Sequence, residues 1–223
     1  MNDTERDFKN ELFEQLARIG KAVANPHRLE LIDLLAQGER RVDALARETD
    51  LAVANASLHL QALQRARLVE RRRVGTEVRY RLADPLVARL WQDIRALGEA
   101  RLAEVAQLVG LYFANRSHLE AIDMDTLQER VAAGAVIVID VRPEAEYRSG
   151  HLPGARSIPV SELLARLREL PTDEPIVAYC RGPYCVMADE AVSLLTTHGY
   201  RAARFEGGFP DWQAAGLPVE REA

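Results

Sequence analysis

Both cysteines of the chain lie within one six-residue stretch, Cys180-Arg181-Gly182-Pro183-Tyr184-Cys185. A cysteine thiolate is a strong nucleophile, and it could take up a sulfur atom as a persulfide whose negative charge is held by backbone N–H donors. Free cysteine is also among the most deeply buried residue types, so a pair of inert structural thiols is the alternative. The residue types alone leave both interpretations open.

Two predicted elements flank this stretch and decide what surrounds the thiol. Residues 175–179 are a short apolar run with β-branched side chains, which predicts a buried parallel strand. Residues 186–198 carry apolar side chains at helical intervals, which predicts a helix that ends before Gly199. A tight loop between them places Cys180 near backbone amides and the positive helix end, and Arg181 adds a cation. We therefore expect a lowered pKa for Cys180.

The second cysteine, Cys185, has two interpretations that the sequence does not separate. As a resolving thiol, it would attack a persulfide on Cys180 and give a disulfide or a sulfur-bridged pair. As a structural residue, it would fill space at the start of the helix, and spacing alone does not fix the geometry of a bridge. Structural zinc takes four ligands, and only His151 and His198 lie near the cysteines in sequence, so neither a metal nor a cofactor is expected.

Four landmarks surround the cysteine loop in the second half of the chain. They are Asp140–Arg142, Gly150–Ala155, Ile158–Pro159 and Glu206–Trp212. In this order they resemble a rhodanese domain over residues 123–223. The resemblance implies an α/β fold with a central parallel sheet and a sulfurtransferase-like loop in which Cys180 forms the persulfide. Asp140 and Arg142 would then support the loop and would not react themselves.

The length of the loop bears on the substrate class. Relatives of rhodanese that act on phosphate or arsenate have a loop one residue longer, and cysteine phosphatases carry an arginine six residues after the nucleophile. That position is Val186 here. A bidentate guanidinium is the usual clamp for such an oxyanion, so the loop is expected to suit sulfane sulfur, with arsenate-related chemistry less favoured.

The composition is that of a globular protein with two domains of different charge. The chain has 223 residues, 48% of them apolar and 28% charged, with no apolar run that approaches the length of a membrane span. Its first residues lack the apolar core of a signal peptide, and two cysteines suit a reducing cytoplasm.

Residues 123–223 hold 10 of the 29 basic residues but 16 of the 34 acidic ones. The two halves are therefore expected to have different partners.

The first half predicts a mainly-α domain with a β-hairpin. The expected helices span residues 10–24, 26–35, 42–48 and 53–65, and the hairpin strands span 68–74 and 77–82. A short helix, a tight turn and a longer helix outline a helix-turn-helix, which the hairpin follows as a wing. The expected domains are residues 1–113 and 123–223, joined by a polar linker over residues 114–122.

Arginines concentrate on the longer helix and the hairpin. Seven of them lie between Leu58 and Leu82, against two acids. Cations at this place suit phosphate contacts on DNA, although a solvated charged hairpin is the alternative. Ala56, Leu60 and Leu63 should pack inward, which turns the opposite face of the helix toward the major groove. The candidate DNA-binding residues are Asn55, Ser57, Leu58, Gln61, Arg65, Arg72, Arg73 and Arg79.

The order of these elements, with the Ser57–Leu60 segment and the wing, resembles the ArsR-type winged-helix repressors over residues 8–110. The resemblance implies a homodimer built from the first helix and from a helix over 85–111, which carries an apolar stripe. An intramolecular core is the alternative use of that stripe. Metal sensors of this family have cysteines before the turn or histidines on the last helix. This chain has neither, so metal sensing is not expected.

These features predict a cytoplasmic, homodimeric transcriptional regulator, a repressor on family resemblance, that binds a double-stranded DNA operator. Its other partners would be a small sulfur donor (thiosulfate, polysulfide or a persulfide) and a thiol acceptor, without a membrane. The alternative is an enzyme that moves sulfane sulfur between such partners and uses DNA binding for autoregulation.

Overall fold

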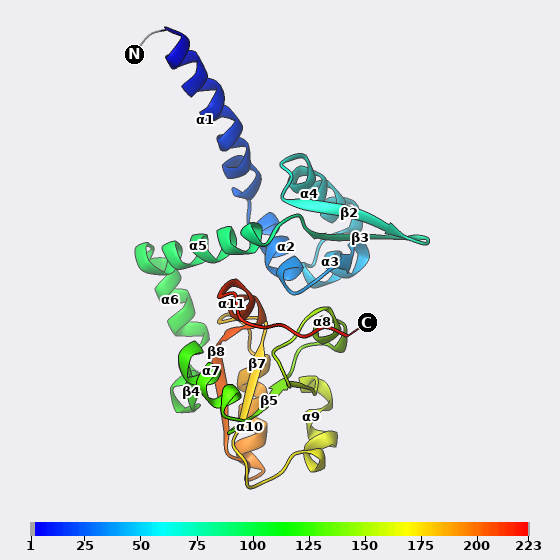
Figure 1. The fold of residues 1–223 in the computed structure, drawn as a ribbon, viewed down its shortest axis with the longest axis vertical. Helices are drawn as coiled ribbons and strands as arrows, with labels where there is room; N and C mark the ends of the chain where they lie inside the picture. The colour runs from blue at the N-terminus through cyan, green and yellow to red at the C-terminus, as the bar shows by residue number, and fades with distance from the viewer. Residues whose placement is uncertain (1–2, 223) are drawn as a thin grey trace. The chain divides into compact units, whose positions relative to one another are not determined.

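The computed structural model describes residues 3–222, and the chain divides into two compact units, Met1–Trp91 and Gln92–Ala223 (Figure 1). The division lies within helix α5 (Pro85–Arg101), before the linker expected over residues 114–122. Within residues 3–222, none of the helices combines the length and the apolar character that crossing a bilayer requires.

The first unit is a winged helix-turn-helix, as the sequence predicts. Its elements before α5 are α1 (Asp3–Val23), α2 (Pro26–Ala36), β1 (Arg40–Arg41), α3 (Val42–Glu48), α4 (Val53–Arg65), β2 (Val69–Val74) and β3 (Glu77–Leu82). The strands form an antiparallel sheet in the order β1-β3-β2. The Asn25 side chain caps α2 by accepting a hydrogen bond from the Arg28 amide, and Pro26 suits the first helical turn because no donor is needed there.

A tight turn closes the wing. Gly75 has φ +60°, in the left-handed region that glycine enters without steric cost. This conformation allows a two-residue connection, so that Val74 pairs with Glu77 and Tyr80 lies opposite Arg71. The hairpin therefore turns where the sequence predicts, and its register decides which arginines share a face.

The core of the first unit joins the inner faces of α2, α3, α4 and the hairpin. On α4, the buried side chains are the predicted three, Ala56, Leu60 and Leu63. They pack in a cluster with residues from the other elements, among them Leu31, Ile32, Leu35, Leu45, Val69 and Tyr80. Because this set is buried, the opposite face of α4 is left to solvent.

The helix predicted over residues 85–111 is two helices, so that part of the prediction is wrong. The backbone of Leu102 is extended (φ −108°, ψ 105°), which ends α5 and lets α6 (Ala103–Tyr112) begin after it. Large apolar side chains remain exposed on both helices and on α1. They are Phe8, Leu12, Phe13, Leu16 and Ile19 on α1, and Leu86, Leu97, Leu108, Leu111 and Tyr112 on α5 and α6.

The second unit is an α/β domain with a central parallel sheet, as predicted. Its strands are β4 (Ala121–Ile122), β5 (Ile137–Asp140), β6 (Arg156–Ser157), β7 (Ile176–Cys180) and β8 (Ala202–Gly208), in the order β4-β8-β7-β5-β6. Its remaining helices are the 3-10 helices η1 (Ala114–His118) and η2 (Leu167–Glu169), with α7 (Met124–Ala132), α8 (Glu144–Ser149), α9 (Val160–Arg166), α10 (Met187–Thr197) and α11 (Phe209–Ala214).

Both faces of this sheet are covered, which explains why β7 is apolar at every position. Ile176, Ala178 and Cys180 point toward α9, η2 and α10. Val177 and Tyr179 point the other way, toward a cluster with residues of α7 and α11. Alternate residues of a strand face opposite sides of its sheet, so a strand between two layers of helices buries all of its side chains.

Most of the expected linker is folded into the second unit. Its first part is η1, and its last part, β4, pairs in parallel with β8 through Ala121 opposite Arg204 and Ile122 opposite Phe205. The segment before β4 is therefore anchored to the sheet, and it brings Arg116 to the cysteine loop.

Candidate functional site

The cysteine loop joins the end of β7 to the start of α10, at the carboxyl edge of the parallel sheet, where open α/β sheets bind their ligands. The chain is crowded here. A Cβ on Gly208 would lie 2.4 Å from the carbonyl carbon of Arg181 and from the amide nitrogen of Gly182. Only glycine allows β8 to approach the loop this closely, which accounts for Gly208 in the Glu206–Trp212 landmark.

Cys180 lies between the apolar core and the polar backbone of the loop. It is 2% exposed and packs in the cluster that α10 covers. Its sulfur lies 3.9 Å from the carbonyl oxygen of Gly182 and 3.8 Å from that of Cys185. The amides of Gly182 and Ala188 also donate toward it. The predicted amide surroundings of the sulfur are therefore present, although the thiol is deeply buried.

The two thiols are free and hydrogen-bonded to each other, and this separates their pKa values. The pKa of Cys180 is raised well above its usual value, because its thiol donates to Cys185 and is buried. Accepting that hydrogen bond lowers the pKa of Cys185 to about 7, with help from the amides of Met187 and Arg181. The expected lowering at Cys180 is therefore wrong, because the lowered pKa of the pair belongs to Cys185.

Arg181 is paired, so part of the positive charge expected beside the thiols is neutralised. Its guanidinium bonds both carboxylate oxygens of Glu146, the closest at 2.6 Å, and Glu146 is only 3% exposed. A buried carboxylate needs such a partner, so the pair attaches the loop to α8. The remaining attraction of Arg181 contributes to the lowered pKa of Cys185.

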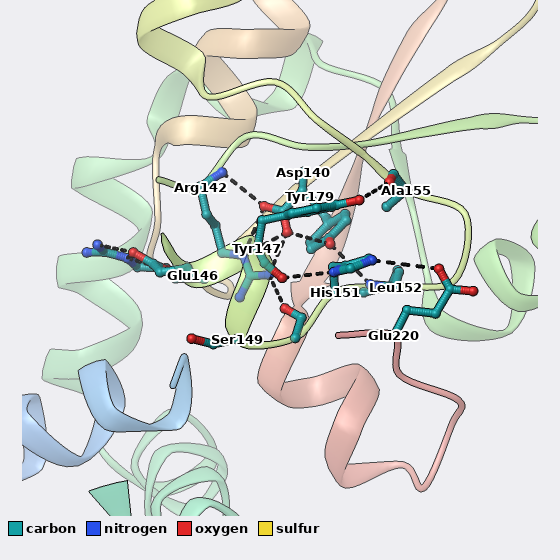
Figure 2. A network of polar contacts seen from close by, with 12 residues as sticks. Asp140, Arg142, Glu146, Tyr147, Ser149, His151, Leu152, Ala155, Tyr179 and Glu220 are labelled. Atoms are coloured by element: carbon teal, nitrogen blue, oxygen red, sulfur yellow. Dashed lines mark hydrogen bonds and ion pairs between the residues drawn. The ribbon is translucent and has the colours of Figure 1, made fainter. Parts of the chain in front are cut away.

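A buried polar network holds the end of β7 (Figure 2). Asp140 and Arg142 are both fully buried, and Arg142 Nη2 lies 2.5 Å from Asp140 Oδ2. The Tyr179 hydroxyl donates to the same carboxylate at 2.5 Å, and Arg142 also donates to the carbonyl oxygen of Gly150 at 2.7 Å. Since Tyr179 directly precedes Cys180, the two residues proposed as supports lie where they can hold the loop in place.

The network continues to the C-terminal residues (Figure 2). The rings of His151 and Tyr147 stack with their centroids 3.7 Å apart, and His151 Nε2 lies 3.6 Å from the Glu220 carboxylate. The Tyr147 hydroxyl donates to the carbonyl oxygen of Ala155 at 2.9 Å. These contacts hold the Gly150–Ala155 landmark against the sheet and give its histidine a structural use.

The outward face of α4 presents the residues predicted for it. Asn55, Leu58, Gln61 and Arg65 are exposed, with Leu58 at 62%, and Ser57 is half-buried. This is the arrangement that a recognition helix needs, because its side chains must leave the protein surface to reach base edges.

The candidate arginines of α4 and the wing fall into two groups. Arg72 is bound by Glu39 at 3.0 Å and Arg79 by Glu77 at 2.7 Å, so part of their charge is neutralised within the first unit. Arg65, at the end of α4, and Arg73, on the wing, have no acidic partner among residues 3–222. Cations without a carboxylate neighbour are the better phosphate ligands, so these four candidates are not equivalent.

Three side chains at the thiol site were not among the sequence candidates. Glu146, Tyr179 and Arg116 contact the loop or the residues beside it. Only Tyr179 had a signal in the local sequence: its position at the end of the predicted strand, directly before Cys180, places it at the site. Glu146 and Arg116 lie in segments that read as ordinary polar helix and linker, and their partners are far away in sequence.

Comparisons with known proteins agree with this architecture. Residues 123–215 match the rhodanese-like domain family, and residues 25–71 match the family of bacterial regulatory proteins called arsR. The chain is 33% identical over 100 residues to a sulfurtransferase of Allochromatium vinosum, which covers 44% of this chain and 92% of that relative.

The strongest of these similarities extends over both units. The chain is 47% identical over 217 residues to the HTH-type transcriptional regulator Rv0324 of Mycobacterium tuberculosis, which covers 97% of this chain and 95% of the relative. Among solved structures, the homodimeric winged helix-turn-helix domain of Mb0332 from Mycobacterium bovis is 45% identical, with a TM-score of 0.41, and covers 46% of this chain and 91% of that chain. The chain therefore belongs to the ArsR-family transcriptional regulators and carries a rhodanese-like domain at its C-terminal end.

Proposed function

We propose that this regulator represses its operator as a homodimer and that reactive sulfur, taken up at Cys180, changes its affinity for DNA. The observation that carries the proposal is the hydrogen-bonded pair of free thiols in the rhodanese loop, which are the only two cysteines of the sequence. The cytoplasm is the compartment that offers both DNA and reduced thiols. Because both cysteines lie in the loop, a reactive-sulfur signal that modifies cysteine would be received there.

The ionisation of the pair suggests how sulfur is taken up. Cys180 attacks the sulfane sulfur of a polysulfide, and its proton passes along the hydrogen bond to the Cys185 thiolate. A bond forms between Cys180 Sγ and the transferred sulfur, while the shortened polysulfide leaves with the electron pair of the broken S–S bond. The amides of Gly182 and Ala188 are available to stabilise negative charge at this site.

A second step would close a bridge. Cys185, protonated in the first step, first loses its proton to solvent. Its thiolate then attacks Cys180 Sγ, the Cys180–Cys185 bond forms, and hydrosulfide leaves with the outer sulfur. The two thiols are oxidised and the sulfane sulfur is reduced, so electrons balance without another reagent.

The deciding experiment compares operator affinity before and after polysulfide treatment, in the wild type and in Cys180→Ser. We expect the affinity of the wild type to fall by about tenfold or more, which corresponds to about 1.4 kcal/mol. Cys180→Ser should keep its affinity, and any sulfur that it gains should lie on Cys185 in a peptide mass spectrum. Equal affinities in all four samples would refute the sensor.

A second function is favoured by the similarity to a sulfurtransferase over most of that relative's length. In this alternative the protein moves sulfane sulfur from thiosulfate or polysulfide to a thiol acceptor, with DNA binding for autoregulation. Steady multiple turnover that Cys180→Ser abolishes would establish it, whereas a single stoichiometric transfer supports the sensor.

Dimerisation is supported by the apolar side chains that α1 and α5 expose. Phe8 and Phe13 are 63% and 65% exposed on α1, and Leu86 and Leu97 are 70% and 64% exposed on α5. Repeated large apolar residues on helices mark a surface for a partner. We propose that a second copy of the chain covers them, which equilibrium sedimentation would test.

The two groups of wing arginines give a prediction about DNA. Arg73→Ala should weaken binding to all sequences alike and reduce the slope of log affinity against log salt by about 1, because one phosphate contact is lost. Arg79→Ala should have a smaller effect, since Glu77 already binds that guanidinium. Titrations of an operator duplex at several salt concentrations measure both slopes. Equal losses for the two variants would contradict the division into groups.

A further inference from the structure

One arginine outside the rhodanese landmarks binds the cysteine loop. The Arg116 guanidinium donates hydrogen bonds to the carbonyl oxygens of Pro183 and Cys185, the latter at 2.7 Å. It also donates to Asp189 Oδ2 at 2.6 Å, and its central carbon lies 3.5 Å from the centroid of the Phe113 ring. The side chain is only 15% exposed. Arg116 of η1 thus joins the segment expected as a linker, residues 114–122, to the cysteine loop and to the first turn of α10.

Residues of α5 in the same unit contact the loop as well. The Tyr184 hydroxyl donates to the Glu99 carboxylate at 2.5 Å. Arg95 Nη2 lies 2.7 Å from Asp211 Oδ1, and Asp211 accepts a hydrogen bond from the Gly208 amide at 2.8 Å. We call residues 92–118, which hold all these side chains of α5 and η1, the helical arm. Loop and arm therefore share several polar contacts within the second unit.

We infer that Arg116 is a positioning residue that couples the covalent state of the Cys180–Cys185 pair to the helical arm. The inference rests on the proposed function for its biological meaning. Its physical basis is that Arg116 holds the carbonyl group of one of the two reacting residues, so the chain at Cys185 cannot move without changing the contacts of the arm.

Closing the bridge would supply such a movement. Both thiols are free in the reduced loop, whereas a disulfide has an S–S bond of about 2 Å and restricted torsion angles. In this inference the backbone at Cys185 shifts as the bond forms, and its carbonyl oxygen, 2.7 Å from Arg116 Nη2 before oxidation, moves away from the planar guanidinium. Because Arg116 keeps the Asp189 carboxylate, its charge is not left unpaired when the loop departs. Loss of the contacts between Arg116 and the loop therefore leaves no unpaired buried charge on the arm.

Hydrogen exchange of the full-length protein tests the coupling. Diamide closes the bridge without any sulfur donor, because it accepts the two electrons and two protons that the thiols release. We expect backbone amides of residues 113–119 to exchange at least about tenfold faster after bridging in the wild type. In Arg116→Gln they should exchange rapidly before oxidation and change by less than about twofold after it.

Three further variants complete the test. Arg201→Gln removes an exposed arginine that donates to a carbonyl oxygen far from the loop, of Asp173, and should behave as the wild type. Cys185→Ser cannot form the bridge and should show no change with diamide. Arg116→Lys keeps a cation for Asp189 but cannot bind two carbonyl groups in the plane of a guanidinium, so its exchange should lie between those of wild type and Arg116→Gln.

The outcomes separate this inference from the proposed function. A wild-type protein that bridges without faster exchange, or that fails to bridge with diamide, overturns the coupling. So does an Arg116→Gln protein that exchanges as slowly as the reduced wild type. If exchange responds to diamide while polysulfide leaves operator affinity unchanged, the coupling stands and the sulfur sensor is refuted.

Discussion

Replacing Asp140 by alanine is expected to lower the free energy of unfolding by about 3–5 kcal/mol, because Arg142 would remain buried without its partner. Both side chains are fully buried, and the Asp140 carboxylate also accepts the Tyr179 hydroxyl. Burial acts against the charge of Arg142, but hydrogen bonds with Asp140 outweigh it and hold the pKa of the guanidinium above its usual value. Urea denaturation followed by circular dichroism measures the loss.

A matched control exists in the same unit. The Arg148–Glu144 pair has the same closest distance, 2.5 Å, but its side chains are 59% and 61% exposed. Glu144→Ala should therefore lower the free energy of unfolding by about 1 kcal/mol at most. The two pairs differ in burial and in the further hydrogen bonds that Asp140 accepts, so equal losses for Asp140→Ala and Glu144→Ala would show that neither controls the stability of this network.

The strand, loop and helix around Cys180 could be predicted because each follows from a local pattern. An apolar run, a glycine after a helix and the order of the landmarks need no knowledge of distant contacts. The ionisation of the thiols could not be predicted in the same way. It depends on which sulfur donates the hydrogen bond, and the conformation of the loop decides that. Proximity to a helix end is therefore an incomplete guide to the pKa of Cys180.

The contacts of charged residues show the same limit. The pattern of Ala56, Leu60 and Leu63 correctly predicts which face of α4 is exposed, because burial follows the helical period. The pairing of Arg72 with Glu39 joins residues 33 positions apart, which no periodicity reveals. The fold of a segment is thus easier to predict than the charge that it presents to a ligand.

Arg116 illustrates why the residues expected as a linker, 114–122, were not recognised as part of the second unit. Its neighbours in sequence are typical of a loop, and nothing local indicates that β4 anchors the segment to the sheet. Once β4 pairs with β8, the connector has a fixed place beside α10, and a long side chain can reach the loop. The functional meaning of the residue arises from this topology, so a search for motifs does not find it.

Alkylation of the cysteine pair is expected to follow a single thiolate that titrates near pH 7. The pKa of Cys185 is about 7, whereas burial and the donated hydrogen bond keep Cys180 protonated. The rate of reaction with iodoacetamide should therefore rise about tenfold per pH unit below 7 and level off above it, with the label on Cys185. Peptide mapping of the modified protein across the pH range gives both the rate and the site.

Two substitutions at residue 180 isolate the hydrogen bond that causes this shift. Cys180→Ala removes the donor, so the pKa of Cys185 should rise toward its usual value and its alkylation at pH 7 should slow by a factor on the order of 10–50. Cys180→Ser keeps a hydroxyl donor at the same place and should retain most of the reactivity. The lowered pKa of Cys185 stabilises the folded protein increasingly as the pH rises from about 7 to the unfolded value, so Cys180→Ala should lose stability relative to the wild type over that interval. At higher pH this loss should shrink, because the raised pKa of Cys180 disfavours the folded wild type there and the alanine variant lacks that thiol. If the alanine and serine variants react at the same rate, the charge on Cys185 does not arise from Cys180, and the proton transfer proposed for sulfur uptake has no basis.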